Sequence, residues 1–422
     1  MKQSVYTRNK LKEMIYFFFN PTEWYEKAYV RHYLKISNPE QVTVCNENEY
    51  NLEKKYDILK RVLSRGLKRD LYLEIMECIN HVRLNETSKE IVEKYNHMLQ
   101  GLQNLTINTF TSERWRTIAT MLYTNGLFRA GAICREKSQQ RLFIKKGHYA
   151  TKVLAYLENG DLQNAKINID KICSNPILLY SIDYQVEYYK FYYNLMNQSG
   201  TNQYDVELQS IDNWDADYSA LMNDQNVRII GPAFEWDGRK KDGEYIIRIN
   251  CMEEEVEEHK ADVLYYSPMI AESIFGDLGL EKVRHHKICI YDYDGYKKQI
   301  KKWRYSYAYD EVFYMGTMHT APHIVMDILL NGGKKVCVEG ITLYMSKQIY
   351  AESYCSYEEA KVIRKYYIYA FARHNLQSQF LFLKNLYHAG KINVDDTLKG
   401  ILDLSIEEYL KGMEELYTFY QQ

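Results

Sequence analysis

The sequence has few of the features that mark membrane-spanning, disulfide-bonded or zinc-binding proteins. No stretch approaches the ~20 apolar residues of a transmembrane helix. The eight cysteines stand singly, with no C-x-x-C pair, and only six prolines interrupt 422 residues. We therefore expect a globular chain with free thiols in a reducing compartment, either free in the cytoplasm or at the inner face of the membrane.

An excess of charge of either sign is also lacking. The formal net charge is -2, and acidic and basic residues are interspersed. This balance gives no general electrostatic attraction to a nucleic-acid backbone, so we do not expect nucleic acid as a partner. Tyrosine is abundant, with 41 residues. Their number alone does not indicate a function; a functional role for a tyrosine has to be argued from its position in the sequence.

Residues 1–200 show helical periodicity almost throughout, which predicts an all-helical region. Within 110–198, a helix, an Asn-Gly pair and a second helix occur twice, with Gly126 and Gly160 34 residues apart. A period of 34 residues is that of tetratricopeptide repeats. Two copies are also compatible with an ordinary helical bundle, so the segment is predicted to be helical and TPR-like.

After a predicted linker at 201–225, residues 226–422 change to short apolar runs separated by helical segments. Continuous apolar runs are typical of strands buried on both faces of a parallel sheet. This pattern predicts an α/β fold with a doubly wound, mainly parallel sheet. The expected strands are 227–231, 244–250, 261–267, 287–292, 311–316 and 334–341, and the expected helices include 268–278, 321–331, 357–387 and 406–420.

The first two predicted strands end in residues that suit a nucleotide. Gly231 is followed by Pro232 and Ala233, and a glycine there lets a ligand approach the backbone closely. The next strand ends with Arg248 and Asn250. A guanidinium can pair with a phosphate or carboxylate, and an amide can recognise a base edge or a sugar hydroxyl.

A second candidate site lies at the start of the predicted helix 321–331. Thr320 is expected to cap this helix, between His319 and Ala321. A helix N-terminus offers unsatisfied N–H groups and the positive end of the helix dipole, which suits a phosphate or carboxylate. A capped helix without any ligand would have the same sequence pattern.

The order of these motifs resembles the bacterial sialyltransferases of glycosyltransferase family 42. The resemblance covers about residues 226–392 and implies a GT-A-like variant of the α/β fold. Ala233, Ala321 and Pro322 depart from the family pattern. The matching features are the first strand with its Gly-Pro turn, the Arg-x-Asn of 248–250, the third strand and helix around Ser267, the turn at Thr320, the pair Gly340-Ile341, the tyrosines Tyr344 and Tyr350 six positions apart, and the segment that opens with His374.

The resemblance implies an inverting, metal-independent transferase of bacterial surface glycan biosynthesis. Such an enzyme moves sialic acid or a related nonulosonic acid from a CMP-sugar donor to a hydroxyl of a glycan acceptor. Tyr344 and Tyr350 would hold the leaving phosphate, since a phenol with a pKa near ~10 stays protonated at neutral pH. His374 would take the acceptor proton, with His319 and His323 as rivals. No metal or other cofactor is expected.

Two other functions stay open from the sequence. Asp292 and Asp294 form a D-x-D string, which is typical of metal-dependent transferases that use nucleotide-diphosphate sugars. The chain could instead be a non-catalytic helical-repeat interaction protein with a degenerate nucleotide-binding domain. The helical half also leaves homo-oligomerisation and peripheral membrane association open.

Overall fold

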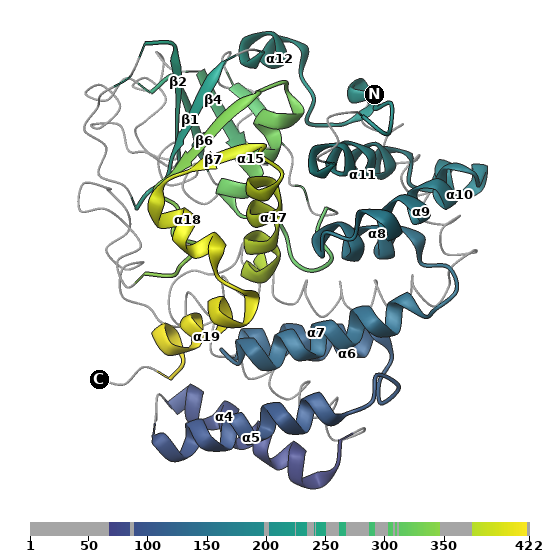
Figure 1. The fold of residues 1–422 in the computed structure, drawn as a ribbon, viewed down its shortest axis with the longest axis vertical. Helices are drawn as coiled ribbons and strands as arrows, with labels where there is room; N and C mark the ends of the chain where they lie inside the picture. The colour runs from purple at the N-terminus through teal and green to yellow at the C-terminus, as the bar shows by residue number, and fades with distance from the viewer. Residues whose placement is uncertain are drawn as a thin grey trace. The chain divides into compact units, whose positions relative to one another are not determined.

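The computed structural model shows a series of helices followed by a parallel sheet with further helices (Figure 1). The α/β class is confirmed, and so is the all-helical region over the described part of residues 67–197; residues 1–66 of that predicted region lie outside the described residues. The structure describes residues 67–84, 88–197, 202–223, 225–233, 240, 242–249, 261–266, 287–291, 303–306, 309, 312–346 and 374–419.

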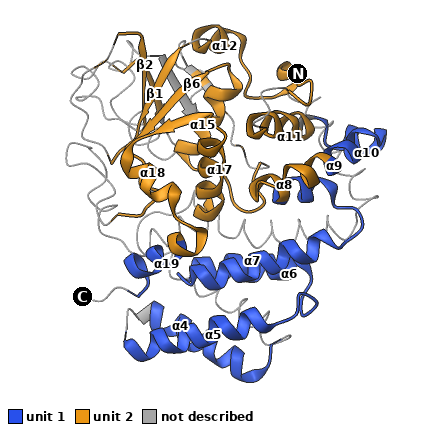
Figure 2. Ribbon diagram, viewed as in Figure 1, with its two compact units in different colours: residues 1–155, 167–183, 410–422 blue, residues 156–166, 184–409 orange. Residues whose placement is uncertain are grey.

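The chain divides into two compact units (Figure 2). The first comprises Met1–Ala155, Ile167–Asp183 and Leu410–Gln422, and the second comprises Tyr156–Lys166 and Tyr184–Tyr409. This division differs from the boundary expected at 201–225. That segment was predicted as a linker, but it lies within the second unit, where it contains a helix and the buried Asn213.

Every described element before the sheet is a helix. Short polar side chains cap several of these helices, as Thr111 does by accepting a hydrogen bond from the N–H of Arg114. The elements are α4 (Arg69–Leu84), α5 (Lys89–Asn104), α6 (Ser112–Thr124), α7 (Phe128–Phe143), α8 (Tyr149–Glu158), α9 (Leu162–Cys173), α10 (Pro176–Ser181), α11 (Asp183–Met196), the 3-10 helix η2 (Leu208–Ser210) and α12 (Ala216–Met222).

Both Asn-Gly pairs that were noted in the sequence form left-handed turns between helices. Gly126 lies between α6 and α7 with φ +76°, and Gly160 lies between α8 and α9 with φ +72°. Helix α7 packs against α6 at Gly131, where an added Cβ would lie 2.7 Å from the ring of Tyr123. Glycine therefore provides the turns and the close helix approach.

Residues near the C-terminus complete the first unit through a buried carboxylate. Glu414 accepts hydrogen bonds from the Tyr95 hydroxyl at 2.5 Å and from the N–H and Nε of Arg129 at 2.7 and 2.6 Å. Burial raises the pKa of Glu414, whereas Arg129 lowers it. The guanidinium and the phenol together satisfy a charge that would be costly to bury alone.

Among the described residues, the sheet of the second unit has seven parallel strands in the order β5-β4-β3-β2-β1-β6-β7. The strand order reverses direction between β1 and β6, so the sheet is doubly wound and has its topological switch point there. The strands are β1 (Asn226–Ile230), β2 (Glu244–Ile249), β3 (Val263–Tyr266), β4 (Lys287–Tyr291), β5 (Trp303–Ser306), β6 (Lys335–Glu339) and β7 (Ile392–Val394).

The strand predicted at 311–316 is wrong. Residues 312–316 form a series of bends instead, and residues 312–315 are buried. Their apolar character therefore reflects burial in a loop, which the Ser378 hydroxyl holds by donating to the Met315 carbonyl. Strands β5 and β7 were not predicted, because they are short and carry polar residues.

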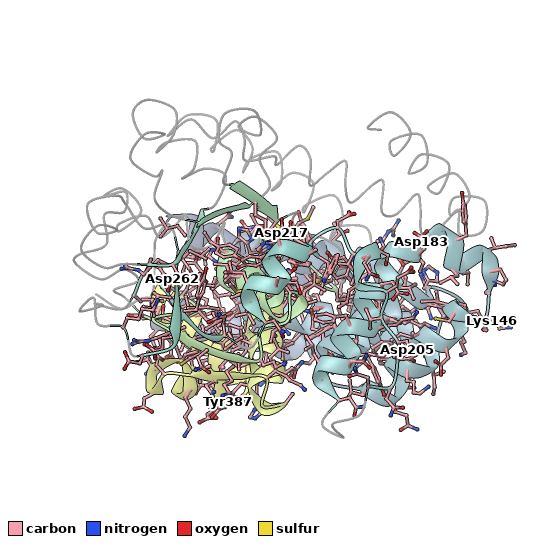
Figure 3. The ribbon with its side chains drawn as sticks, turned by 90° about the horizontal axis from the view of Figure 1, so that it is seen from above. Lys146, Asp183, Asp205, Asp217, Asp262 and Tyr387 are labelled. Atoms are coloured by element: carbon pink, nitrogen blue, oxygen red, sulfur yellow. The ribbon has the colours of Figure 1, made fainter. Side chains whose placement is uncertain are left out.

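Helix α15 (Thr320–Leu330) covers one face of the sheet, and α17 (Leu376–His388) packs against it (Figure 1). That face carries fully buried aliphatic side chains in register, including Ile229, Ile247 and Val263. Asp262, labelled in Figure 3, lies directly before β3. Its carboxylate accepts from the N–H of Ile246 at 2.7 Å. Two further helices, α18 (Asp396–Asp403) and α19 (Ile406–Tyr417), follow β7.

Four polar side chains at intervals of four residues line one side of α15. They are His319, His323, Asp327 and Asn331. The last three are fully buried. His323 Nε2 is hydrogen-bonded to the Ser306 hydroxyl at 2.7 Å, and Asn331 donates to the Asn213 carbonyl at 3.2 Å. This polar line joins α15 to β5 and to the segment before the sheet.

Asp327 is the centre of the polar line. Arg304 binds it with both guanidinium nitrogens, at 2.5 and 2.8 Å, and Tyr265 donates its hydroxyl at 2.6 Å. The guanidinium also lies 4.3 Å from the centroid of the Tyr218 ring. A bidentate, desolvated pair of this kind fixes both the rotation of α15 about its axis and its position along the sheet.

Replacing Asp327 with Asn should destabilise the protein by about 3–5 kcal/mol, because the Arg304 charge stays buried without its carboxylate. The free energy of unfolding in urea measures this loss. Asp403→Asn, at an exposed position of α18, is the control and should stay within about 0.5 kcal/mol of the parent. A loss at Asp327 as small as the control would contradict the central role of the ion pair.

Burial lowers the pKa of His323 to about 3, with Arg304 acting in the same direction and Asp327 against it. An unfolded histidine titrates near ~6.5, so between these values the unfolded state binds more protons. Stability should therefore fall on acidification from about pH 6.5 toward pH 3, by up to about 1.4 kcal/mol per pH unit.

His323→Gln should flatten this pH dependence, as measured by urea unfolding at a series of pH values. His388→Gln, at an exposed position, should keep the parental slope. If the two variants gave the same slope, His323 would not be the titrating group.

Candidate functional site

The carboxyl ends of β1 and β6 meet at the switch point. The N–H of Gly231 donates to the Glu339 carbonyl at 2.7 Å, and the N–H of Ala233 donates to the Gly340 carbonyl at 3.1 Å. A Cβ on Gly231 would lie 2.4 Å from the Gly340 oxygen and 2.2 Å from Cδ1 of Ile341. A side chain does not fit at this position, so the predicted glycine turn is a close backbone approach.

The turn after β6 is held by residues from α18 and α19. Asp395, the cap of α18, accepts from the N–H of Gly340 at 2.7 Å, and the Tyr409 hydroxyl donates to the Leu343 carbonyl at 2.8 Å. Leu343 and Tyr344 both have left-handed backbones, with φ +45° and +65°. Such conformations are costly for residues with side chains and concentrate at functional sites.

This turn brings Tyr344 together with two histidines. The Tyr344 hydroxyl and His319 Nε2 are hydrogen-bonded at 2.9 Å. The His319 ring meets the His374 ring edge to face, with centroids 4.8 Å apart. The hydroxyl of Thr317 lies 3.3 Å from His374 Nδ1. The structure thus assembles a phenol and two imidazoles from three separate segments, and three of the predicted residues meet here.

Gln379 holds the two histidine-bearing segments together. Its side-chain oxygen accepts from the N–H of His319 at 3.0 Å, and its amide nitrogen donates to the carbonyls of Thr317, at 2.8 Å, and His374. Gly316 makes room for this approach, since an added Cβ would lie 2.8 Å from the carbonyl carbon of His374. The spacing between the histidines is therefore fixed by backbone contacts.

Two helix N-termini lie at the same edge of the sheet. Helices α15 and α17 lead into β6 and β7, so both begin where the parallel strands end. The cap of α15 is His319, without a side-chain cap bond, and Thr320 is the first helical residue, so the predicted Thr320 cap is wrong by one position. Ala321, the next predicted residue, is buried. Helix α17 is capped by Asn375. Both helices present the positive ends of their dipoles to this edge.

Arg248 projects from the other face of the sheet. It is paired with Ile230 in register, whereas Tyr265, which contacts Asp327 of α15, is paired with Ile249. Side chains alternate between faces, so Arg248 lies opposite the face that α15 covers. On its own face Arg228 binds Glu339 at 2.7 Å, and this hydrogen bond raises the pKa of Arg228.

Of the remaining predicted residues, Pro232 lies half-buried beside Gly231. His323, a rival for the base, is fully buried, and its pKa of about 3 is too low for a base near neutral pH. Asn250, Ser267 and Tyr350 lie outside the described residues, as do Asp292 and Asp294, and they stay predictions. Within the described ranges, no three His, Cys, Asp or Glu side chains are grouped to hold a metal ion.

Sequence reasoning missed the residues that orient the site. Gln379 gives no signal, because a glutamine inside a helix is usually a surface residue. Asp395 could have been found, since Val394, Asp395 and Asp396 lead into a helix and an aspartate there is a typical cap. Thr317 lies two residues before His319. Its role as a partner of His374 becomes visible only in the folded structure, where the two side chains meet.

Gly231→Ala should destabilise the protein by about 1–3 kcal/mol, because the added methyl overlaps the Gly340 carbonyl and Ile341. Gly400→Ala is the matched control, since nothing lies within 4 Å of its Cβ position in α18. The control should gain up to about 1 kcal/mol from helix propensity. Urea unfolding distinguishes the two, and equal values would show that the β1 and β6 turns do not touch.

Comparisons with protein-family models, with curated proteins and with solved structures gave no match. No helix in the described part of the chain has the length and apolar character needed to cross a bilayer.

Proposed function

We propose that the second unit is a glycosyltransferase that moves sialic acid or a related nonulosonic acid from a CMP-sugar to a hydroxyl of a glycan acceptor. The observation that carries this proposal is the Tyr344, His319 and His374 cluster at the carboxyl edge of the sheet. In doubly wound folds ligands bind at this edge, near the switch point. The resemblance to the family 42 sialyltransferases supplies the donor class.

On the donor side, the leaving phosphate needs hydrogen-bond donors. The Tyr344 hydroxyl is one, and the N-termini of α15 and α17 add main-chain N–H groups and a positive potential. Gly231 and Gly340 leave main chain, not side chains, at the ends of β1 and β6. These features favour a ligand that brings a phosphate to the edge of the sheet.

On the acceptor side, His374 is the proposed base. If its Nδ1–H donates to the Thr317 hydroxyl at 3.3 Å, Nε2 carries the lone pair that can take a proton. The acceptor oxygen then forms a bond to the anomeric carbon as its proton passes to His374. The bond from that carbon to the phosphate oxygen breaks, its electron pair stays with CMP, and the configuration inverts.

Nucleotide binding tests the proposal. CMP should raise the melting temperature more than UDP or GDP at the same concentration, with and without EDTA, and at about one hundred times Kd it should add about 2.7 kcal/mol of stability. Tyr344→Phe should weaken CMP binding by roughly ten- to a hundredfold, because a hydrogen bond to a charged phosphate is lost. Thermal melting measures the first effect, and isothermal titration calorimetry measures the second.

Tyr180→Phe is the control, since Tyr180 is an exposed tyrosine of α10, and it should bind CMP as the parent does. An equal response to the three nucleotides would overturn the proposal. A response to a diphosphate that EDTA abolishes would favour the Asp292 and Asp294 alternative. No response to any nucleotide would favour a non-catalytic interaction protein.

A further inference from the structure

Helix α10 leaves its apolar side chains at the surface. Its sequence is Pro-Ile-Leu-Leu-Tyr-Ser, and its only buried residue is Ser181. Ile177 and Tyr180 are exposed, and the two leucines between them are half-buried. A surface helix of a globular protein normally turns its apolar side chains toward the core. In α10 this arrangement is reversed, so the helix offers an apolar surface to something outside the unit.

Exposed large apolar side chains are concentrated in one stretch of the chain. Of the five in the described residues, four lie between positions 144 and 180, and the fifth, Leu73, is on α4. Single apolar residues scattered over a surface are normal, whereas a group of them marks an interaction site. The four are Ile144 at 61% exposure, Ile167 at 43%, Ile177 at 48% and Tyr180 at 42%.

The start of α8 and the end of α9 lie together. The ammonium of Lys171, in the last turn of α9, is 5.6 Å from the centroid of the Tyr149 ring, at the first position of α8. Residues 144–148 lead into this end of α8, and residues 174–175 lead from α9 into α10. Ile167 is one turn before Lys171 on the same side of α9. The exposed apolar side chains are therefore grouped around one end of this helix pair, within the first unit (Figure 2).

The same helix ends carry an excess of positive charge. From 144 to 157 and from 171 to 182 the sequence has four lysines and no acidic residue. Asp170 directly precedes the second of these stretches, and Glu113 of α6 binds Lys145 at 2.9 Å. These two acids balance at most two of the four lysines, so this end of the helix pair stays positive.

The lysines lie close enough to repel each other. The ammonium of Lys152 donates to the Lys145 carbonyl, and burial together with the charge of Lys171 lowers the pKa of Lys152. Within the described part of the chain, no carboxylate pairs with Lys146, Lys152 or Lys171. Like charges that are held together without carboxylates favour an anion that comes from outside the chain.

We infer that the surface formed by Ile144, Lys146, Lys171 and α10 binds a lipid bilayer that contains anionic phospholipids. The lysines contact the lipid phosphates, and the exposed apolar side chains enter the boundary between headgroups and acyl chains. This inference does not rest on the proposed glycosyltransferase activity.

The combination of charge and apolar surface favours a bilayer over other occupants. A bilayer places anionic phosphates directly beside an apolar layer, which matches lysines beside aliphatic side chains. A nucleic acid would attract the lysines, but its bases stack on aromatic rings and gain little from isoleucines. In a two-fold dimer the same patch faces itself, so the lysines of one copy would meet those of the other.

Binding of the intact chain to vesicles tests the inference. In a flotation assay, vesicles of phosphatidylcholine with about one third phosphatidylglycerol should bind the protein at least about tenfold more tightly than pure phosphatidylcholine. Raising the salt to about 0.5 M should weaken this binding, because the lysine charges are screened. Equal binding to the two kinds of vesicle, or binding to neither, would overturn the inference.

Charge variants test the lysines. Lys146→Gln and Lys171→Gln should each weaken binding to the anionic vesicles by about fivefold, which corresponds to ~1 kcal/mol for a lysine near the lipid surface. Lys399→Gln, at an exposed position of α18, is the charge-matched control and should bind as the parent does. A control effect as large as that of the two variants would mean that only the overall charge matters, and the surface would not be the binding site.

Apolar variants test the insertion. Ile144→Asn and Ile177→Asn should each weaken binding by roughly five- to tenfold, because an aliphatic side chain no longer leaves water. Leu73→Asn, at the similarly exposed position of α4, should bind as the parent does. Melting followed by circular dichroism should be parental for all three, since the changed side chains are exposed. Parental vesicle binding by both isoleucine variants would contradict the proposed insertion.

Two measurements distinguish the bilayer from other occupants. Inorganic phosphate should not displace the protein from anionic vesicles any more than chloride at the same ionic strength does; specific displacement would indicate a site for a free anion. Light scattering should give the same mass for the parent and for Ile177→Asn. A dimer that this change dissociates would show that a second copy of the chain covers α10. Either of these contrary results would overturn the inference.

Discussion

The bidentate ion pair between Arg304 and Asp327 is the interaction on which the site depends. It anchors α15 to β5 from inside the core, where neither charge can be left alone. The same side of α15 carries His323, bonded to Ser306, and one turn further His319. Because the helix is rigid, the ion pair at Asp327 fixes the position of His319, which lies eight residues earlier. The buried Arg304–Asp327 pair thus sets the position of the His319 imidazole.

The sheet supplies the second constraint. The strand order reverses between β1 and β6. The connections that follow these two adjacent strands therefore run to opposite sides, and no single connection covers both carboxyl ends. The turns meet through Gly231 and Gly340, and the turn after β6 continues to Tyr344. Helix α15, held by the Arg304–Asp327 ion pair, and the turn after β6, held by backbone contacts, are therefore joined by the hydrogen bond between Tyr344 and His319.

The sequence predicted the parts of the fold whose signal is local. The apolar run that became β2 is buried on both faces over residues 246–249, whereas β1 and β6 alternate for the most part between buried and half-buried or exposed residues. Helix α15 is apolar apart from Thr320, His323 and Asp327. The strand predicted at 311–316 was wrong, because a buried loop can have the same apolar composition as a buried strand. Strands β5 and β7 escaped notice for the opposite reason, being short and partly polar.

The site was predictable only in part. Tyr344 and His374 were predicted from the order of motifs along the chain, whereas the contact of His319 with both depends on where distant segments meet. Gln379 acts through main-chain groups that any residue could provide, so no pattern reveals it.

The buried carboxylate of Glu414 also has a consequence for biosynthesis. Its partners, Tyr95 and Arg129, lie about three hundred residues earlier, and the Thr418 hydroxyl likewise donates to the Gly126 carbonyl. On a ribosome these early helices emerge long before the groups that satisfy them. Until residue 414 has been translated, the Arg129 guanidinium and the Tyr95 hydroxyl therefore lack the carboxylate that they bind in the folded unit.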